Sequence, residues 1–204
     1  MSNRLHLDLG SGPNPRNPLM RDIAIGLDLR GDRSLTDADT QSLDGEVMFW
    51  DALRGSLPFE TSSVSSVSAY DFLEHIPRVW PAASGDTLYP FVDLMSEIYR
   101  VLEPGGLLLA ATPGYPGRDA FSDPTHINFI SLDTGQYFCG ESPPARMYGF
   151  KGCFEIELNH FGLHKLLSMP QHSAFYRWTL NFYRRATNRG VPHILWRFRA
   201  VKLR

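Results

Sequence analysis

Three acidic residues lie near the ends of three apolar segments at the start of the chain. Two glycines follow the first of these segments. The run LDLGSGPN places Asp8 ahead of Gly10 and Gly12, and Asp28 comes sixteen residues after Gly12. Asp51 follows the third segment. Glycine lets the backbone approach a ligand closely, and a carboxylate at a strand end can accept hydrogen bonds from both hydroxyls of a ribose. Each acid alone is typical of a surface or capping position, but their order and spacing favour a nucleoside site, with Asp51 accepting the amino group of adenine.

Two later histidines are suited to proton transfer. His75 ends the segment YDFLEH after the fourth apolar segment, and His126 lies in FSDPTHINF after the fifth. A histidine with a pKa of about 6.5 can take the proton of an acceptor hydroxyl near neutral pH. His75 and His126 are therefore the candidate catalytic residues. The structural alternative is that His75 orders its loop through hydrogen bonds and that Asp123 with Thr125 builds a turn.

The same two segments also contain a possible set of metal ligands. Asp71, Glu74 and His75 have an acid-x-x-Glu-His spacing, and they would share one face of a helix that began at Asp71. With His126 they would offer two oxygen and two nitrogen ligands to Mg²⁺, Mn²⁺ or a similar ion. Such spacing occurs often by chance. A divalent metal is therefore the secondary interpretation, behind a simple histidine base.

Strands and helices alternate along the chain. Strands are predicted over residues 5–9, 23–29, 47–50, 64–70, 107–112, 154–158 and 195–201. Apolar residues between Leu88 and Leu102 recur at the spacing of an amphipathic helix, which Glu103-Pro104-Gly105-Gly106 should end. A further helix is expected to start with Ser131 as its cap. This alternation predicts a single α/β domain with a Rossmann-like, doubly wound, mostly parallel sheet and an antiparallel last strand, whose ligand lies beyond the carboxyl ends of the strands.

The loop after the first strand argues against a dinucleotide-binding oxidoreductase. Such a protein would have G-x-G-x-x-G leading into a helix, whose N-terminus holds the pyrophosphate. Here the loop GSGPNP contains Pro13 and Pro15, and Pro18 follows it. The helix after this loop should therefore be short or broken.

The pattern as a whole resembles the class I S-adenosylmethionine-dependent methyltransferases, particularly those with small-molecule acceptors. The matching pieces are LDLGSGPN, GLDLR, DALRGSLPF, YDFLEHI and MSEIYRVLEPGGLLLAATP, within about residues 5–113. The usual third glycine of the loop is replaced by Asn14, a residue that tolerates left-handed backbone. The acid-x-x-Glu-His segment is similar to that of divalent-metal-dependent O-methyltransferases of ubiquinone synthesis and of small-RNA ends.

The resemblance implies a role for each residue of the cofactor site. Asp8, Gly10 and Gly12 would cradle the methionine portion of S-adenosylmethionine. Asp28 would hold the ribose, and Tyr70 would lie beside the sulfonium. Asp51 and Ala52 would bind the adenine. The cofactor-binding half would cover about residues 1–113, and residues 114–204 would supply an acceptor-covering loop and a basic C-terminal part.

Two motifs that would indicate a DNA acceptor are absent from the sequence, which narrows the class of acceptor molecule. The fourth strand is not followed by the S/D/N-P-P-Y/F motif of amino-methylating DNA enzymes, and no Pro-Cys pair supplies a nucleophile for cytosine methylation. Methyl transfer to oxygen of a small-molecule, sugar or lipid-linked acceptor is therefore expected, with nitrogen left open. The alternatives are a non-catalytic S-adenosylmethionine-binding partner protein, which the intact acids at positions 8, 28 and 51 disfavour, and an RNA or nucleotide methyltransferase.

Charge is divided unevenly along the 204 residues. All 22 Asp and Glu lie in residues 1–158, together with 11 of the 20 Lys and Arg, whereas residues 159–204 carry the other nine basic residues and no acid. Arginines alternate with aromatic residues in AFYRWTLNFYRRATNR. This part could contact a phosphate-bearing acceptor, nucleic acid or an anionic membrane surface, or it could pair with the acidic body of the protein.

Composition favours an ordinary globular protein. Hydrophobic residues make up 43% of the chain and charged residues 21%. No apolar run approaches the roughly 20 residues that span a bilayer, and MSNRLHLDLG shows no signal peptide. Cys139 and Cys153 are too few for a disulfide framework. A soluble, reduced, cytoplasmic protein is the simplest interpretation.

Overall fold

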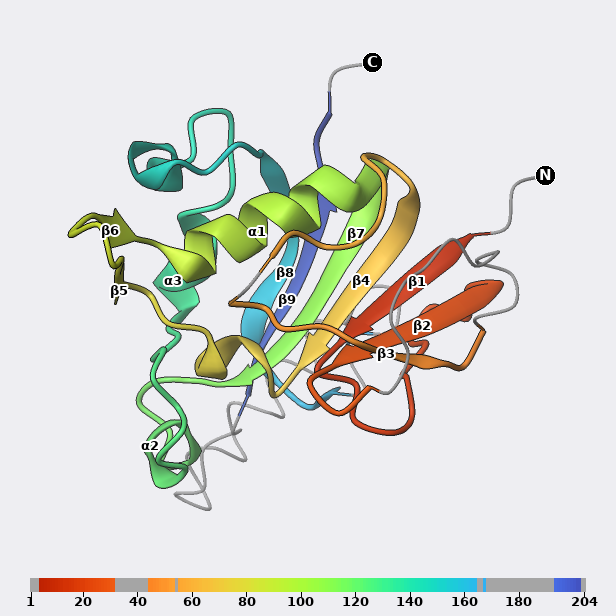
Figure 1. Cartoon of the computed structure of the whole chain (residues 1–204), viewed down its shortest axis with the longest axis horizontal. Coiled ribbons are helices and arrows are strands. Elements are labelled where there is room, and N and C mark those ends of the chain that lie inside the picture. The colour runs from red at the N-terminus through yellow and green to blue at the C-terminus, as the bar shows by residue number, and fades with distance from the viewer. Residues whose placement is uncertain (1–3, 32–43, 54, 165–166, 168–192, 203–204) are drawn as a thin grey trace, which may run out of the picture.

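The computed structural model describes residues 4–31, 44–53, 55–164, 167 and 193–202. Seven strands form its main sheet. They are β1 (Leu5–Leu9), β2 (Ile23–Asp28), β3 (Val47–Phe49), β4 (Val64–Tyr70), β7 (Leu102–Pro113), β8 (Phe154–Gly162) and β9 (His193–Ala200). Their order across the sheet is β3-β2-β1-β4-β7-β9-β8, and β9 alone runs antiparallel to its neighbours (Figure 1). The predicted doubly wound sheet with an antiparallel last strand is confirmed.

The chain reverses its direction of travel across the sheet between β1 and β4. From β1 it moves outward through β2 to β3, and it then returns to the other side of β1 to form β4. In open α/β sheets ligands bind at such a switch point, outside the carboxyl ends of the strands. The predicted cofactor residues lie near the ends of β1, β2, β3 and β4, and the predicted catalytic histidines follow β4 and β7, so the topology brings them to this edge.

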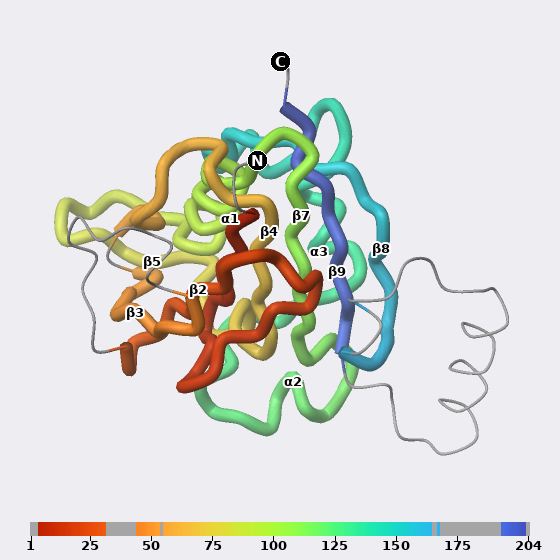
Figure 2. The backbone as a smooth tube through the Cα atoms, turned by 90° about the vertical axis from the view of Figure 1, so that its right-hand side faces the viewer, coloured from red at the N-terminus to blue at the C-terminus, as the bar shows by residue number. Residues whose placement is uncertain are grey.

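Helix α1 (Pro90–Val101) crosses one face of the sheet and leads directly into β7 (Figure 1). Its apolar face, with Phe91, Met95 and Ile98, packs into the core together with the buried side chains of β1, β4 and β7. The helix begins two residues later than predicted, because Pro90 takes a first-turn position where its missing N–H costs nothing. Figure 2 shows α1 and the irregular connection between β1 and β2 from a second direction.

Strand β7 is longer than the predicted 107–112 segment. It starts at Leu102, immediately after α1, and passes through the Glu-Pro-Gly-Gly segment that was expected to be a turn. The pairing with β4 is irregular there, because Val64 lies opposite Leu102 whereas Ser66 lies opposite Leu107. Gly105, with φ of +80°, permits this local distortion.

The remaining described elements are short. They are the 3-10 helices η2 (Leu73–His75) and η3 (Pro144–Tyr148), helices α2 (Asp119–Ser122) and α3 (Leu132–Gln136), and the hairpin β5 (Trp80–Pro81) with β6 (Thr87–Leu88). The expected cap of α3 is present, since Ser131 N donates to Thr134 Oγ1 at 3.0 Å. The segment between Gly10 and Asp22 contains no helix, which confirms the effect expected of its prolines. No helix among the described residues is long and apolar enough to cross a membrane.

Candidate active site

The loop after β1 is shaped by its two glycines. Gly10 and Gly12 have φ of +63° and +60°, the left-handed region that glycine adopts without strain. The N–H of Gly10 donates to Leu27 O at 2.8 Å, so the loop is fastened to β2. A Cβ on Gly10 would lie 2.6 Å from the ring of Phe72, whereas a Cβ on Gly12 would meet nothing within 4 Å. The backbone at Gly12 is therefore open to a ligand.

Asp28 lies at the carboxyl end of β2 and joins two loops. Its carboxylate accepts hydrogen bonds from Gly12 N at 3.0 Å and from Arg30 N at 2.9 Å. The side chain is only partly buried. A carboxylate has about four lone-pair sites, so two hydroxyls of a ribose can still be accommodated beside these backbone donors.

Asp8 is completely buried and forms part of a polar row across β1 and β4. It accepts hydrogen bonds from Ser68 Oγ at 2.5 Å and Arg16 N at 2.8 Å, and burial raises its pKa. Because the Ser68 hydroxyl donates to Asp8, its oxygen accepts from His6 Nε2, 2.9 Å away. His6 Nδ1, 2.8 Å from Ser66 Oγ, then accepts from that hydroxyl, because burial lowers the pKa of His6 to about 3 and keeps it neutral. Asp8 thus holds the loop rather than facing an open site.

Asp51 and Ala52 lie just after β3, where adenine contacts were expected. Asp51 Oδ1 accepts a hydrogen bond from Leu53 N at 3.0 Å, and Ala52 packs against the core. Leu29 and Phe49 at the ends of β2 and β3 are 63% and 55% exposed, and Leu53 is 50% exposed. These apolar side chains were not predicted as site residues from the sequence. Their position near the ends of two predicted strands is the feature that could have identified them.

Tyr70 is the last residue of β4. Its ring lies 5.0 Å from the guanidinium carbon of Arg16 and makes an edge contact with His164, the ring centroids being 5.5 Å apart. Burial, with a smaller effect of the charge on Asp8, raises the pKa of Tyr70 to about 12. The phenol is therefore neutral at physiological pH, and its aromatic ring can lie against a sulfonium.

Glu74, His75 and His126 converge at the start of the acceptor side. One potential ligand atom from each lies within 4.8 Å of the others, and the two imidazole rings make an edge contact with centroids 4.9 Å apart. Glu74 is buried, its Oε2 accepts from Thr112 Oγ1 at 2.8 Å, and burial raises its pKa. Within the part of the chain that the structure describes, Glu74 Oε1 and His126 Nδ1 are buried without a hydrogen-bond partner. These unsatisfied atoms fit a ligand, since buried polar atoms are almost always paired.

His75 also orders the loop that follows β7 through hydrogen bonds, which is the structural role expected as the alternative to catalysis. Its Nδ1 lies 3.0 Å from Thr125 Oγ1, and that hydroxyl lies 2.7 Å from Asp123 Oδ1. Thr125 N also donates to Asp123 Oδ1 at 2.8 Å, which forms the expected turn. Because the hydroxyl donates to Asp123, it accepts from His75 Nδ1–H. Neutral His75 therefore presents the lone pair of Nε2.

The loop after β7 is docked on η2 through backbone hydrogen bonds. The N–H groups of Ile127 and Asn128 both donate to Glu74 O, at 3.0 and 2.9 Å, and Asn128 Nδ2 donates to Leu73 O at 3.1 Å. Arg78 Nε in turn donates to Asn128 Oδ1 at 2.6 Å. This arrangement brings His126, distant in sequence, to η2.

Asp71 does not join the metal set proposed from the sequence. The predicted helix from Asp71 is absent, because η2 starts only at Leu73 and Asp71 has a left-handed φ of +51°. The side chain turns instead toward β9, where Oδ1 lies 2.7 Å from His193 Nε2. Burial alone would raise the pKa of Asp71, but the hydrogen bond and charge of His193 outweigh it and lower that pKa. The four predicted ligands therefore divide between two clusters.

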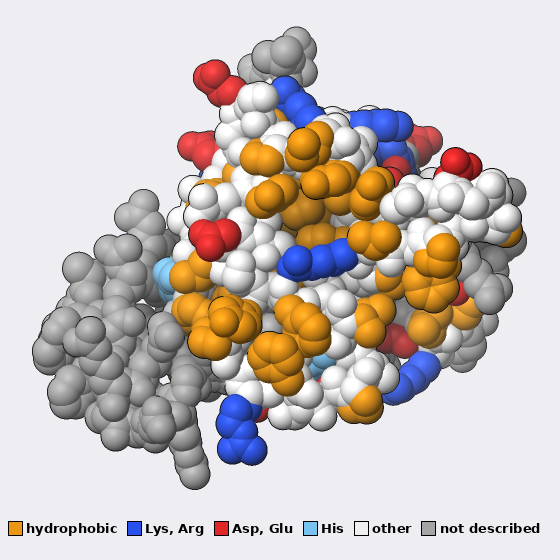
Figure 3. All heavy atoms as spheres, turned by 90° about the vertical axis from the view of Figure 1, so that its left-hand side faces the viewer, with side chains coloured by type: hydrophobic (Ala, Val, Ile, Leu, Met, Phe, Trp, Pro, Cys, Tyr) orange, Lys and Arg blue, Asp and Glu red, His pale blue; other side chains and the backbone are white. Residues whose placement is uncertain are grey.

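Two cavities contain few of the predicted site residues. One, of about 970 Å³, runs along α1 from Leu53 to Lys202, and Ala52 is the only predicted site residue that lines it. The other, of about 430 Å³, lies between Arg78 and Tyr137. It belongs to the face formed by the β5–β6 hairpin, α2 and α3, where apolar side chains gather around a hollow (Figure 3). Neither cavity is lined by the predicted acids and histidines, which lie at the strand ends instead.

No family model and no curated protein matches the chain. Among solved structures, the putative methyltransferase in a Haloferax volcanii complex with the Trm112 methyltransferase activator matches over 98% of this chain and 84% of that one, at 17% identity and a TM-score of 0.53. A SAM dependent methyltransferase from Archaeoglobus fulgidus matches over 98% of this chain and 86% of that one, at 15% identity and a TM-score of 0.53. The chain has the class I S-adenosylmethionine-dependent methyltransferase fold.

The class I methyltransferase fold does not by itself determine the reaction. The [4+2]-cyclase SpnF matches over 98% of this chain and 75% of that one, at 16% identity and a TM-score of 0.50. Proteins with different activities are thus similar to this chain at comparable levels. The function must therefore be argued from the side chains at the strand ends.

Proposed function

We propose that the chain binds S-adenosylmethionine at the carboxyl ends of β1 to β4 and transfers its methyl group to an oxygen of a small-molecule, sugar or lipid-linked acceptor. The observation that carries the proposal is the junction of Gly12 and Asp28, where open backbone meets a half-buried carboxylate. The cofactor supplies a methyl group activated by its sulfonium. The exposed side chains of Leu29, Phe49 and Leu53 support an adenine position between the ends of β2 and β3.

His75 takes the acceptor proton in this proposal. Its Nδ1 is held by Thr125, and its Nε2 lone pair is left to accept. His126 lies between two carboxylates, with Nε2 4.0 Å from both Glu74 Oε1 and Asp123 Oδ2, so it can share or relay the proton. A positioned base of this kind contributes roughly 10²- to 10⁴-fold to a rate. Tyr70, neutral and apolar on its ring face, lines the position of the transferred methyl.

Replacement of Asp28 tests the cofactor assignment. Asp28→Ala should weaken binding of S-adenosylmethionine by about 1.5–3 kcal/mol, because charge-assisted hydrogen bonds to the ribose are lost. Asp22→Ala is the matched control, since Asp22 precedes the opposite end of β2 and bonds Arg4 N at 2.8 Å. Calorimetry gives both affinities. Equal affinity of wild type and Asp28→Ala would refute the assignment.

Replacement of the histidines tests the chemistry separately. His75→Gln and His126→Gln should each lower the methyl-transfer rate at saturating cofactor by about 10²-fold or more while cofactor affinity stays unchanged. The assay needs an acceptor found by screening hydroxylated small molecules and sugars for release of S-adenosylhomocysteine. If both variants turn over at the wild-type rate, neither histidine is the base.

A divalent metal at Glu74, His75 and His126 is the second candidate for the same step. The unpartnered Glu74 Oε1 and His126 Nδ1 favour it. An ion bound there would lower the pKa of the acceptor hydroxyl. Activity that survives exhaustive chelation would exclude the metal and leave the histidine base, whereas activity restored only by an added divalent transition-metal ion such as Mn²⁺ would favour the ion.

A further inference from the structure

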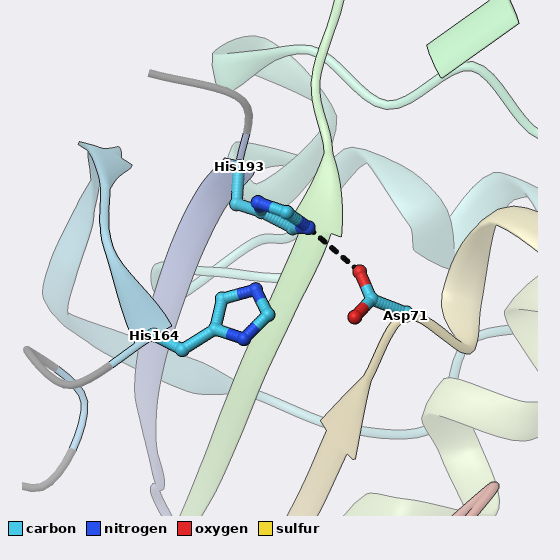
Figure 4. A group of neighbouring side chains, drawn as sticks. All are labelled: Asp71, His164 and His193. Atoms are coloured by element: carbon cyan, nitrogen blue, oxygen red, sulfur yellow. Dashed lines mark hydrogen bonds and ion pairs between the residues drawn. The ribbon is translucent and has the colours of Figure 1, made fainter. Parts of the chain in front are cut away.

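A second cluster of side chains, Asp71, His164 and His193, lies outside the set used in the proposed reaction. Figure 4 shows the three side chains converging from the end of β4, the segment after β8 and the start of β9. One potential ligand atom from each lies within 4.8 Å of the others. His193 Nε2 and Asp71 Oδ1 are in direct contact at 2.7 Å, and the His164 and His193 rings meet edge to face with centroids 4.2 Å apart.

The sheet itself imposes this convergence. His193 lies opposite both Pro113 of β7 and Gly162 of β8, so β9 begins where those two strands end. Asp71 N donates to Ala111 O of β7 at 2.8 Å, which places Asp71 at the same edge. The left-handed backbone of Asp71, uncommon for a non-glycine residue, points its carboxylate toward the two rings.

Hydrogen bonds within the cluster satisfy only some of the polar atoms of its three side chains. Asp71 and His193 form a pair, but His164 Nε2 is buried and has no hydrogen-bond partner among the described residues. The unsatisfied nitrogen of His164 thus lies within reach of the Asp71–His193 pair. Because buried polar atoms are almost always paired, this nitrogen fits a bound ligand.

We propose that Asp71, His164 and His193 bind a divalent transition-metal ion such as Zn²⁺, with one coordination position left open. Two imidazoles and one carboxylate are a ligand set that Zn²⁺ and related ions accept, whereas Mg²⁺ and Ca²⁺ take oxygen ligands. With metal–ligand bonds of about 2.1 Å, tetrahedral ligands are roughly 3.4 Å apart, which falls between the contact of 2.7 Å and the limit of 4.8 Å.

The site is distinct from Glu74, His75 and His126, and the experiment must separate the two clusters. We use His126→Asn as the background, since it removes one ligand of the other cluster. Into it we introduce His164→Ala or His193→Asn, and the latter keeps a side-chain amide able to bond Asp71. The probe is Zn²⁺ alone, titrated into the metal-free full chain by calorimetry, with Co²⁺ as a replacement whose visible absorption reports tetrahedral nitrogen and oxygen ligands.

We expect His126→Asn to bind one Zn²⁺ and to show the Co²⁺ absorption. Either further substitution should weaken Zn²⁺ binding by at least about 100-fold, because losing a ligand costs more than the 10- to 100-fold of a lost outer-shell partner. No stoichiometric Zn²⁺ uptake by His126→Asn, or unchanged uptake in both double variants, would overturn the proposal. Circular dichroism shows whether each variant is folded. If the double variants do not fold, Zn²⁺ uptake by the folded His126→Asn variant tests the proposal.

Binding of S-adenosylmethionine is measured on the same samples, so that the two proposals fail independently. Asp28→Ala should lose affinity for the cofactor while it keeps Zn²⁺. His193→Asn should show the reverse. A chain that binds Zn²⁺ at the cluster but no cofactor would refute the proposed function and leave the metal site standing.

Discussion

At the scale of single residues, the buried histidine on β1 makes stability depend on pH. Burial, with a smaller effect of Arg21, lowers the pKa of His6 from 6.5 to about 3. The unfolded chain takes up a proton on His6 as the pH falls below about 6.5, but the folded chain does not until about 3. The contribution of neutral His6 is therefore complete above pH 6.5 and is lost as the pH falls toward 3, by at most about 1.4 kcal/mol per pH unit.

Replacing His6 isolates this contribution. In His6→Gln the free energy of unfolding should fall less steeply between pH 6.5 and pH 4 than in the wild type, because glutamine takes up no proton. Urea unfolding at several pH values gives the difference. Glu74, whose pKa is raised by burial, acts in the opposite direction but equally in both proteins. Parallel pH curves would show that His6 titrates normally in the folded chain.

The two loop glycines provide a matched pair of substitutions. Gly12→Ala puts a Cβ into open space at a left-handed φ and should cost about 1–2 kcal/mol of stability. Gly10→Ala adds a collision with Phe72 at 2.6 Å, which should raise the total to about 2–4 kcal/mol. Denaturant unfolding measures both. Equal losses would mean that Phe72 moves aside freely.

The sequence predicted the acids at strand ends because position after an apolar segment is a local property. It did not predict where Asp71 points, since that depends on a left-handed backbone and on His193, which is 122 residues away. His164 and His193 carried no local signal of chemistry at all. The order of the strands in the sheet brings these two histidines together, and residue spacing along the chain does not reveal that order.

At the scale of elements, α1 is fastened to the loop between β3 and β4 by one arginine. Arg100 Nη1 donates to Phe59 O and Nη2 to Leu57 O, both at 2.8 Å, while Glu97 Oε2 accepts from Leu57 N at 2.9 Å. Arg100 also pairs with Glu97 at 2.8 Å. The helix therefore holds the backbone of this loop from both its donor and its acceptor sides.

Arg100→Met should lower the free energy of unfolding by about 1–3 kcal/mol, because carbonyl groups of the loop lose their donors. Arg100→Lys is the control, since it keeps the charge but lacks the planar fork that reaches two carbonyls at once. We expect it to recover only part of the loss. Thermal and urea unfolding measure the series, and a lysine variant as stable as the wild type would show that charge alone is needed.

Helix α1 and the strands up to β4 could be predicted because their apolar periodicity is strong. Residues 64–70 match β4 at both ends. The β5–β6 hairpin was missed, since its two-residue strands are exposed and lack alternation. Strand β8 continues past the predicted 154–158 to Gly162, because pairing with β9 extends it through residues of mixed polarity.

At the scale of the whole molecule, the basic surplus of residues 159–204 is partly neutralised by the body. Arg199 pairs with Glu157, whereas Lys202 Nζ donates to a neutral backbone carbonyl, Arg100 O, at 2.9 Å and keeps its charge. The aromatic and basic run that contains Arg184 and Arg185 lies outside the described residues. Its proposed partner is a phosphate-bearing acceptor or an anionic surface, and this rests on charge alone.

Binding to anionic lipid vesicles should therefore fall steeply as salt increases, because screening weakens exposed charges. Arg184→Gln with Arg185→Gln should flatten that dependence. Sedimentation with vesicles measures binding, and neutral vesicles are the control. Salt-insensitive binding, or none, would refute an anionic surface as the partner.

The placement of β9 between β7 and β8 also determines the order in which the molecule can be completed during synthesis. Strand β8 pairs only with β9 in the sheet, and β9 follows every other strand in the chain. On the ribosome, β3, β2, β1, β4 and β7 can associate early, while β8 waits without a partner. Until residues 193–200 emerge, the edge of β7 remains open to pairing with other chains, which is the stage at which aggregation is most probable.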